Sequence, residues 1–249
     1  MAFSGGVDST YALLRYNEKE PKNKIDKCLM INGFGYDLSE GSVFGKQYEK
    51  NKDVLGQKGI SLYSAQTNYK KVVAWYPFFH AMGIAAVLNL YAAENEAGAV
   101  GLDYDYAEER RLGPWGNLFV LNTLYSASNF FIDPVGGDKN RVEKIKYLHQ
   151  HGMLSSVTVC NNVERHGKNC GVCEKCVRTM LTCDINAIEY KSIFGRKVAS
   201  EDIERLKISK PTQYIFYTTL IEYVESGSFV KEILDKKIKS YCARKGGEF

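Results

Sequence analysis

Apolar runs of strand length alternate with stretches of helical length and spacing up to His149. The predicted strands cover residues 27–32, 60–65, 99–102 and 130–133. The predicted helices are one that residues 4–9 open and that runs to about residue 16, and those at 43–57, 80–94 and 141–149. Such an alternation is typical of βαβ units, whose strands form a parallel sheet. The pattern therefore predicts an α/β fold, a parallel sheet with helices on both faces.

Two regions depart from this alternation. Residues 103–117 are polar, contain Gly and Pro, and show no packing periodicity, so we expect a loop that lines a ligand site. From about residue 157 a group of cysteines replaces the pattern, and residues 214–223 and 229–238 have the spacing of packed helices. The chain is thus predicted to divide into an α/β domain at 1–156 and a cysteine-bearing, helical C-terminal region at 157–249.

The composition, 45% hydrophobic and 25% charged, is that of an ordinary soluble globular protein. A formal net charge of +4 suits an anionic small molecule but does not by itself indicate nucleic acid. The apolar run at 81–93 is too short to span a bilayer and predicts a buried helix. The start of the chain lacks the pattern of a secretory signal. We therefore expect a cytoplasmic protein with no membrane partner.

Residues 4–9 read Ser-Gly-Gly-Val-Asp-Ser and open the first predicted helix. Gly5 and Gly6 allow the backbone to approach an anion, which successive N–H groups and the positive end of the helix would bind. Ser4 and Ser9 add hydroxyl donors, and Asp8 could cap the helix or help to hold Mg²⁺. A Walker loop would need a lysine that is absent here. A plain Gly-Gly turn into a helix capped by Asp8 is the alternative.

Only Met1, Ala2 and Phe3 precede this loop, whereas the phosphate loop of a doubly wound sheet follows a buried strand of about five residues. We therefore expect either that the native chain is longer or that the missing strand comes from elsewhere.

The hexapeptide at 4–9 resembles the signature of the PP-loop (N-type) ATP pyrophosphatases, which have the adenine nucleotide alpha-hydrolase-like fold. The resemblance implies that the loop, Val7 included, binds ATP with Mg²⁺, and that ATP is cleaved between its α- and β-phosphates. A substrate oxygen attacks the α-phosphorus, pyrophosphate leaves, and a nucleophile then displaces AMP. Asp8, Ser4 and Ser9 are the catalytic candidates in this loop.

Four of the seven cysteines, Cys160, Cys170, Cys173 and Cys176, have the spacing C-x9-C-x2-C-x2-C. Cysteines two residues apart form a knuckle that presents both sulfurs to one tetrahedral ion. Four thiolates leave no open coordination position, so the spacing predicts structural Zn²⁺, with an iron–sulfur cluster as the alternative. His166 is a further candidate ligand that the four cysteines make unnecessary.

Cys160 together with residues 170–178 resembles the zinc site of the 7-cyano-7-deazaguanine synthase family, in which an arginine, here Arg178, follows the last cysteine. Residues 140–145 match the basic helix start of that family, which implies a catalytic role for Arg141. Residues 113–116, Gly-Pro-Trp-Gly, are shared with a group of synthase-like proteins. The Tyr-Pro-Asp-Cys-like element expected of the true synthase after Asp103 is absent. The resemblance therefore does not imply that this chain acts on the substrate of the synthase.

The resemblance implies an ATP-dependent C–N ligase that adenylates a carboxylate, 7-carboxy-7-deazaguanine in that family, and uses ammonia to form an amide or nitrile. One alternative is a tRNA-thiolating PP-loop enzyme, which would need exposed catalytic cysteines or an iron–sulfur cluster. Another is a non-catalytic nucleotide-binding protein within a modification or defence complex. The sequence leaves open whether the chain forms a homodimer or binds a partner chain.

Gly33, Phe34 and Thr67 end predicted strands at the carboxyl edge of the sheet, where ligands bind in open α/β folds. They are candidates for the adenine pocket, and a plain strand-ending turn is the equal alternative. Arg110, Arg111 and Lys144 are further candidate phosphate contacts, for which a solvated surface role is the simpler prediction.

Overall fold

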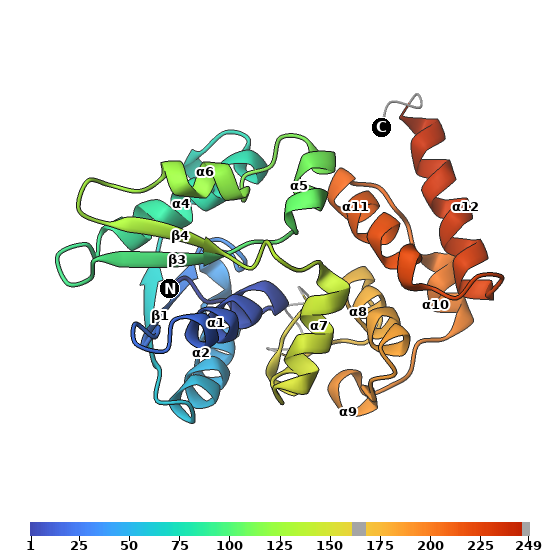
Figure 1. Ribbon diagram of the computed structural model, residues 1–249, viewed down its shortest axis with the longest axis horizontal. Helices are drawn as coiled ribbons and strands as arrows, with labels where there is room; N and C mark the ends of the chain where they lie inside the picture. The colour runs from blue at the N-terminus through green and yellow to red at the C-terminus, as the bar shows by residue number, and fades with distance from the viewer. Residues whose placement is uncertain (161–167, 246–249) are drawn as a thin grey trace.

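The computed structural model describes residues 1–160 and 168–245. Its strands are β1 (Lys27–Asn32), β2 (Ser61–Gln66), β3 (Ala97–Gly101) and β4 (Phe131–Val135). The helices that alternate with them are α1 (Val7–Lys19), α2 (Gly41–Gly56), α3 (Tyr69–Val72), α4 (Tyr76–Asn89), α5 (Tyr106–Leu112), α6 (Phe119–Leu124) and α7 (Arg141–Gln150) (Figure 1). The C-terminal helices are α8 (Glu174–Ile185), α9 (Lys191–Phe194), α10 (Ser200–Arg205), α11 (Pro211–Leu220) and α12 (Phe229–Arg244). Short 3₁₀ turns occur at η1 (Leu38–Glu40), η2 (Leu154–Ser156) and η4 (Ile221–Tyr223).

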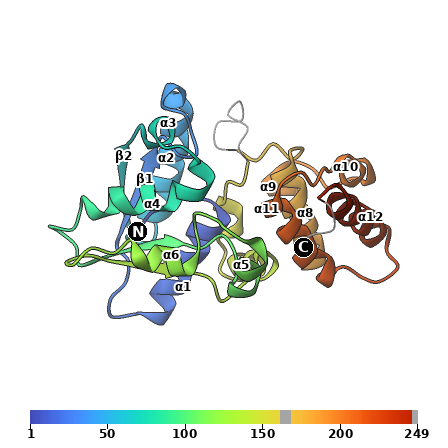
Figure 2. The same ribbon diagram turned by 90° about the horizontal axis from the view of Figure 1, so that it is seen from above.

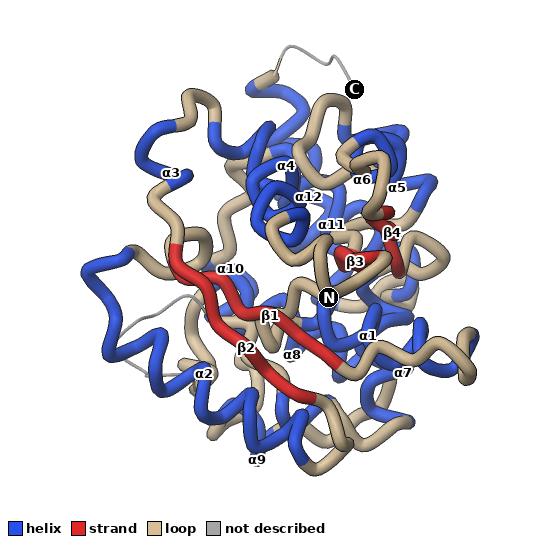
Figure 3. The backbone as a smooth tube through the Cα atoms, turned by 90° about the vertical axis from the view of Figure 1, so that its left-hand side faces the viewer, coloured by secondary structure: helices blue, strands red, loops and turns tan. Residues whose placement is uncertain are grey.

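The strands form two parallel pairs, β1 with β2 (Figure 3) and β3 with β4. Residues 1–3 lie between the two pairs. The Ala2 N–H donates to the Ala99 carbonyl at 2.9 Å, and the Phe3 N–H donates to the Leu29 carbonyl at 2.9 Å. These three residues, which the sequence pattern suggested were too few for a strand, thus occupy the strand position between β1 and β3 and bring the loop at residues 4–9 to the carboxyl ends of both.

Helices cover both faces of this parallel arrangement. Cys28 and Met30 of β1 pack in one core with residues of α1 and α2, whereas Leu29 packs in another core with Ala85 and Leu88 of α4. The alternation follows from the period of two along a strand. The predicted α/β fold with parallel strands and helices on both faces is therefore confirmed.

The C-terminal helices gather on one side of the sheet (Figure 2). A single hydrophobic cluster joins Tyr11 of α1 and Ile145 of α7 to Met180 of α8 and Tyr217 of α11. Packing therefore continues across the boundary proposed at residue 157. It holds α8 and α11 against the end of the strands at which the loop of residues 4–9 lies.

Some local predictions were wrong. Residues 103–117, expected to be a loop, contain α5, which begins with a capping box: the Glu108 N–H donates to Asp105 Oδ1 at 2.7 Å, and the Asp105 N–H donates to Glu108 Oε2 at 3.0 Å. The apolar helix predicted at 80–94 begins at Tyr76, with Pro77 in its first turn. Its outer face is exposed, so it is not the buried helix that we expected. Within the described residues, no helix combines the length and apolar character needed to cross a bilayer.

Candidate functional site

Residues 4–6 form a tight turn that leads into α1, and residues 7–9 are the first turn of that helix. Gly6 is the N-cap residue of α1, and no side chain caps the helix there. The Gly6 N–H donates to Ser4 Oγ at 3.3 Å, and Ser4 Oγ lies 3.2 Å from Ser9 Oγ. Gly5 has φ of 75°, and a Cβ on it would overlap the side chain of Asn51, so this position requires glycine. The positive end of the α1 dipole therefore lies at this loop, where it would attract an anion.

The carboxylate of Asp8 is bound by two cations of α7. Arg141 Nη2 lies 2.7 Å from Asp8 Oδ2, and Lys144 Nζ lies 3.3 Å from Asp8 Oδ1. Lys144 is completely buried, and its ammonium also donates to the Leu102 carbonyl at 2.7 Å. The expectation that Asp8 caps α1 is therefore wrong, because Gly6 holds the cap position. Asp8 instead ties α1 to α7 and, through Lys144, to the end of β3.

A cavity of about 440 Å³ opens beside the loop, within the size range of small-molecule sites. Its walls come from several parts of the chain: the loop and the start of α1 (Ser4, Gly6, Val7, Asp8), the turn after β1 (Gly35, Tyr36), the segment after β3 (Asp103, Tyr104, Trp115), Arg141 of α7, residues 158–160, α8 (Glu174, Lys175, Arg178, Thr179), and α11 with the residue before it (Lys210, Thr212, Gln213, Phe216). The α/β part and the C-terminal helices thus build this cavity together.

Cations outnumber carboxylates around the cavity. Its lining holds Arg141, Lys175, Arg178 and Lys210 against Asp8, Asp103 and Glu174. The Lys175 ammonium is largely buried, and this burial, followed by the charges of Arg178 and Arg141, lowers the pKa of Lys175. Because cations that repel one another in a half-buried space are stabilised by an anion, the cavity suits a phosphate or carboxylate ligand.

Phe216 of α11 organises the two arginines. The guanidinium carbon of Arg178 lies 4.1 Å from the centre of the Phe216 ring, and that of Arg141 lies 5.0 Å from it. The same ring stacks on Tyr104 at 4.7 Å. Arg178 contacts Glu174 at 3.5 Å, and the buried Nε of Arg141 has no hydrogen-bond partner among the described residues. Both guanidinium groups are thus oriented by packing while retaining donors for a ligand.

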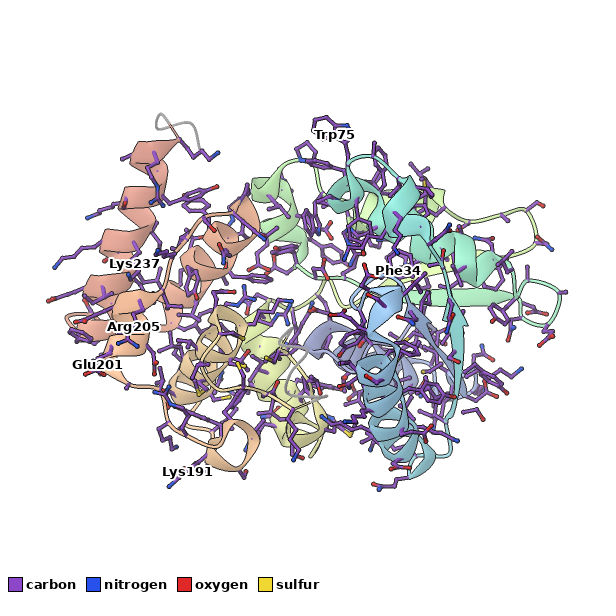
Figure 4. The ribbon with its side chains drawn as sticks, turned by 180° about the vertical axis from the view of Figure 1, so that it is seen from behind. Phe34, Trp75, Lys191, Glu201, Arg205 and Lys237 are labelled. Carbon is purple, nitrogen blue, oxygen red and sulfur yellow. The ribbon has the colours of Figure 1, made fainter. Side chains whose placement is uncertain are left out.

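A second, smaller cavity of about 210 Å³ adjoins the first at the loop. Both are lined by Ser4, Gly6, Asp8 and Asp103, but the second has apolar walls that include Phe34 and Ile84. Phe34 (Figure 4) also packs against Tyr69, with ring centres 5.8 Å apart. The larger cavity is therefore basic and the smaller one apolar, and the loop at residues 4–9 borders both.

Gly33 and Thr67 line neither of these cavities. They border a separate cavity of about 190 Å³ together with Lys70 and Lys71. Gly33 has φ of 107°, and a Cβ on it would overlap the Thr67 carbonyl, so the glycine lets the ends of β1 and β2 approach each other. Of the three adenine-pocket candidates, the structure thus places Phe34 alone at the loop.

Trp115 is anchored in the wall of the larger cavity. Its indole N–H donates to Asp103 Oδ2 at 3.0 Å, and its ring meets the ring of His80 edge-on at 5.2 Å. The segment after β3 is therefore held against α4.

The four clustered cysteines converge on one point. All four sulfurs lie within 4.8 Å of one another, with 3.7 Å between Cys160 and Cys173 and 3.8 Å between Cys170 and Cys176. A tetrahedral ion with metal–sulfur bonds of about 2.3 Å would separate its ligands by about 3.8 Å. A hydrogen bond from the neighbouring Cys176 thiol lowers the pKa of Cys173 to about 5, which favours the thiolate that binds metal. The cluster could therefore hold a metal ion such as zinc. His166 lies outside the described residues.

Residues 157–160 connect the cysteine cluster to the loop at residues 4–9. The Thr158 N–H donates to the Gly5 carbonyl at 2.9 Å, two residues before Cys160. Asn169, which precedes Cys170, accepts from the Val159 N–H at 2.8 Å and donates to the Val157 carbonyl at 3.0 Å. A metal ion at the cysteines would therefore fix the segment that supports one side of the loop.

Comparison of the chain with models of known protein families, with curated proteins and with solved structures found no match. The site is therefore interpreted from its own geometry.

Sequence reasoning missed several residues of this site. Phe216 lies in a Tyr-rich stretch whose spacing indicated only helix packing, and Lys175 lies between two cysteines with no pattern of its own. Among the other cationic candidates, Arg111 donates to Thr219 Oγ1 at 3.0 Å and supports α11, whereas Arg110 lines none of the cavities described above. One signal was available for Lys175: it lies three positions before Arg178, the residue that the resemblance named, and residues at this spacing share one side of a helix.

Proposed function

We propose that the chain is an ATP-dependent synthase of the PP-loop type that adenylates a carboxylate and releases AMP and pyrophosphate. The observation that supports this best is the cavity of about 440 Å³ that lies between the glycine loop at the start of α1 and the cations of α7 and α8. A helix N-terminus and guanidinium groups are both suited to phosphate oxygens.

In this proposal the triphosphate of ATP lies against residues 4–9, where backbone N–H groups and the hydroxyls of Ser4 and Ser9 contact it. The adenine occupies the apolar cavity beside Phe34. A carboxylate oxygen of the substrate attacks the α-phosphorus, and the bond to the β-phosphate oxygen breaks. Arg141 and Arg178 neutralise the negative charge that develops. Asp8 lines both cavities, so in this proposal it would hold Mg²⁺, which would supply further positive charge at the phosphates.

In this proposal the acceptor occupies the larger cavity. Tyr104, Phe216 and Trp115 offer aromatic surfaces for a flat heterocycle, and Asp103 and Glu174 offer acceptors for its N–H groups. A heterocyclic acid such as 7-carboxy-7-deazaguanine combines these features with the carboxylate that the arginines would orient. Ammonia then displaces AMP to give an amide. A nitrile would require a second ATP, which adenylates the amide oxygen so that this oxygen leaves with AMP.

We further propose that the four cysteines hold a structural zinc ion. Of the described residues that line the larger cavity, Cys160 is the one cysteine, and its sulfur belongs to the four-sulfur cluster. A thiolating enzyme needs an available cysteine or an iron–sulfur cluster at its site, so this arrangement with zinc at the four cysteines favours the synthase.

The test is a product analysis with Mg²⁺-ATP, 7-carboxy-7-deazaguanine and ammonium. We expect AMP and pyrophosphate in equal amounts, together with a deazaguanine amide or nitrile detected by mass. Arg178→Met should lower kcat/KM by about 100-fold, because it removes a positioned cation. Arg196→Met is the matched control, since its guanidinium pairs with Asp202 outside the cavity, and it should leave turnover unchanged.

ADP as the nucleotide product would contradict the PP-loop assignment. AMP release with other acids but not with the deazaguanine would overturn the proposed substrate alone. Tight ATP binding without turnover of any acid would favour the non-catalytic alternative.

A further inference from the structure

One outer face of the α/β part carries apolar side chains that nothing in the described chain covers. We call it the α4–α6 face, and its members are Trp75, Phe78, Phe79, Met82 and Leu90 on and beside α4 and Phe119, Val120 and Leu124 on α6. Trp75 is 74% exposed, Leu124 is 72% exposed and Leu90 is 79% exposed. The two helices lie side by side (Figures 1 and 2), and Trp75 projects at the outer edge of the molecule (Figure 4).

The exposed residues of α4 share one side of the helix. Trp75, Phe78 or Phe79, and Met82 follow one another at steps of three or four positions, and Leu90 lies about two turns further on. The opposite side of α4, with Ala81, Ala85 and Leu88, is buried against the strands. Asn89 at the end of α4 donates to the Tyr125 carbonyl at 3.2 Å, which ties α4 to the end of α6. The two helices therefore present their apolar residues together.

The α4–α6 face is also unusual in composition. Neither α4 nor α6 contains Asp, Glu, Lys or Arg. A helix that is apolar all round is normally buried on all sides, and here one side of α4 is buried by the chain while the other is not. A contiguous exposed apolar patch larger than a few hundred Å² marks an interaction surface.

The size of the face matches a protein–protein interface. Aromatic side chains bury about 150–250 Å² each when they are fully covered. With the exposed fractions of the eight residues, the face offers an apolar area on the order of 600–800 Å². A standard interface buries about 800 Å² on each partner, so this face accounts for most of one.

We propose that the α4–α6 face joins two copies of this chain into a dimer with twofold symmetry. In such a dimer each face contacts the same face of the other copy. An apolar surface without formal charges meets its own copy without like-charge repulsion, whereas a charged surface would need a complementary partner. The apolar area of the face is large enough for the interface of a stable dimer.

The dimer would also support the candidate site, although the proposal does not depend on the proposed function. The ring of His80 on α4 contacts Trp115, and Gly116 lies so close to the backbone of Phe78 that a Cβ on it would come within 2.8 Å of the Phe78 carbonyl carbon. Covering the outer side of α4 would therefore hold in place the helix against which the cavity wall packs.

The test is sedimentation equilibrium of the full chain. Interfaces of this size bind with micromolar or tighter Kd, so at about 100 µM we expect a mass twice the 28.1 kDa of one chain. Val120→Glu and Leu124→Glu each place a like charge on this face in both copies, and each should weaken dimerisation at least about 100-fold. Phe229→Glu, an exposed apolar residue on α12 and outside the α4–α6 face, is the control and should leave the dimer intact. Circular dichroism should show that all three variants are folded.

A second measurement locates the contact. The chain has two tryptophans, so Trp115→Phe leaves Trp75 as the single emitter. Its fluorescence should shift to shorter wavelength as the concentration rises through the dimerisation range, because Trp75 leaves water. A monomer at about 100 µM overturns the proposal. A dimer that both charged variants leave intact, or an emission spectrum independent of concentration, overturns the assignment of the dimer to this face.

Discussion

Replacing Lys144 with methionine would remove the completely buried ammonium that binds Asp8 while keeping most of the side-chain volume. Two interactions are lost. The Leu102 carbonyl, which accepts from Lys144 Nζ at 2.7 Å, loses its donor, which costs about 1–3 kcal/mol. Asp8 loses one of its two cations but keeps Arg141 and some solvent exposure, so this loss adds about 1 kcal/mol. We therefore expect Lys144→Met to lower the free energy of unfolding by about 2–4 kcal/mol.

Asp8→Asn leaves the buried Lys144 ammonium without its counter-charge, and breaking a buried pair in this way costs about 3–5 kcal/mol. The double variant removes both charges, so it should be less destabilised than the sum of the two single variants by about 1–2 kcal/mol. Urea unfolding of the four proteins at neutral pH measures this coupling. Lys139→Met is the control, because Lys139 pairs with Glu143 at the surface, where such a pair is worth about 0–1 kcal/mol. Additive effects, or a loss below about 1 kcal/mol for Lys144→Met, would refute the reasoning.

The purified protein should carry about one zinc ion per chain by elemental analysis, and Cys173→Ser should lose the ion and lower Tm; iron with acid-labile sulfide would instead indicate an iron–sulfur cluster. A pH effect is expected from Glu108, whose pKa burial raises above its ordinary value of 4.5. Glu108 then contributes stability that is fully present below pH 4.5 and is lost as pH rises through the raised pKa of the folded state. Over that range the stability of Glu108→Gln should rise relative to the wild type in urea unfolding, and a constant difference would contradict the burial argument.

Features that depend on neighbours along the chain could be predicted from the sequence. The strands followed from apolar runs, and the loop at 4–9 followed from two glycines before a helix. The cysteine cluster followed from the C-x2-C spacing, because a turn of fixed length brings such sulfurs together. Asp105 and Glu108 carried a capping-box pattern that predicts α5, and this local signal was overlooked.

Features that depend on residues far apart in the chain were decided by the tertiary structure. Residues 1–3 take a strand position because Leu29 and Ala99 supply the backbone partners, which no local pattern can indicate. The pairing of Asp8 with Lys144 joins residues 136 positions apart. Burial is equally non-local: the apolar pattern of α4 was compatible with a helix buried on all sides, and only the packing of the other helices showed which side is left uncovered. The sequence by itself determined the chemical groups of the loop and of the cysteine cluster. The tertiary packing determined which charged groups and which surfaces lie beside them, because those neighbours come from distant parts of the chain.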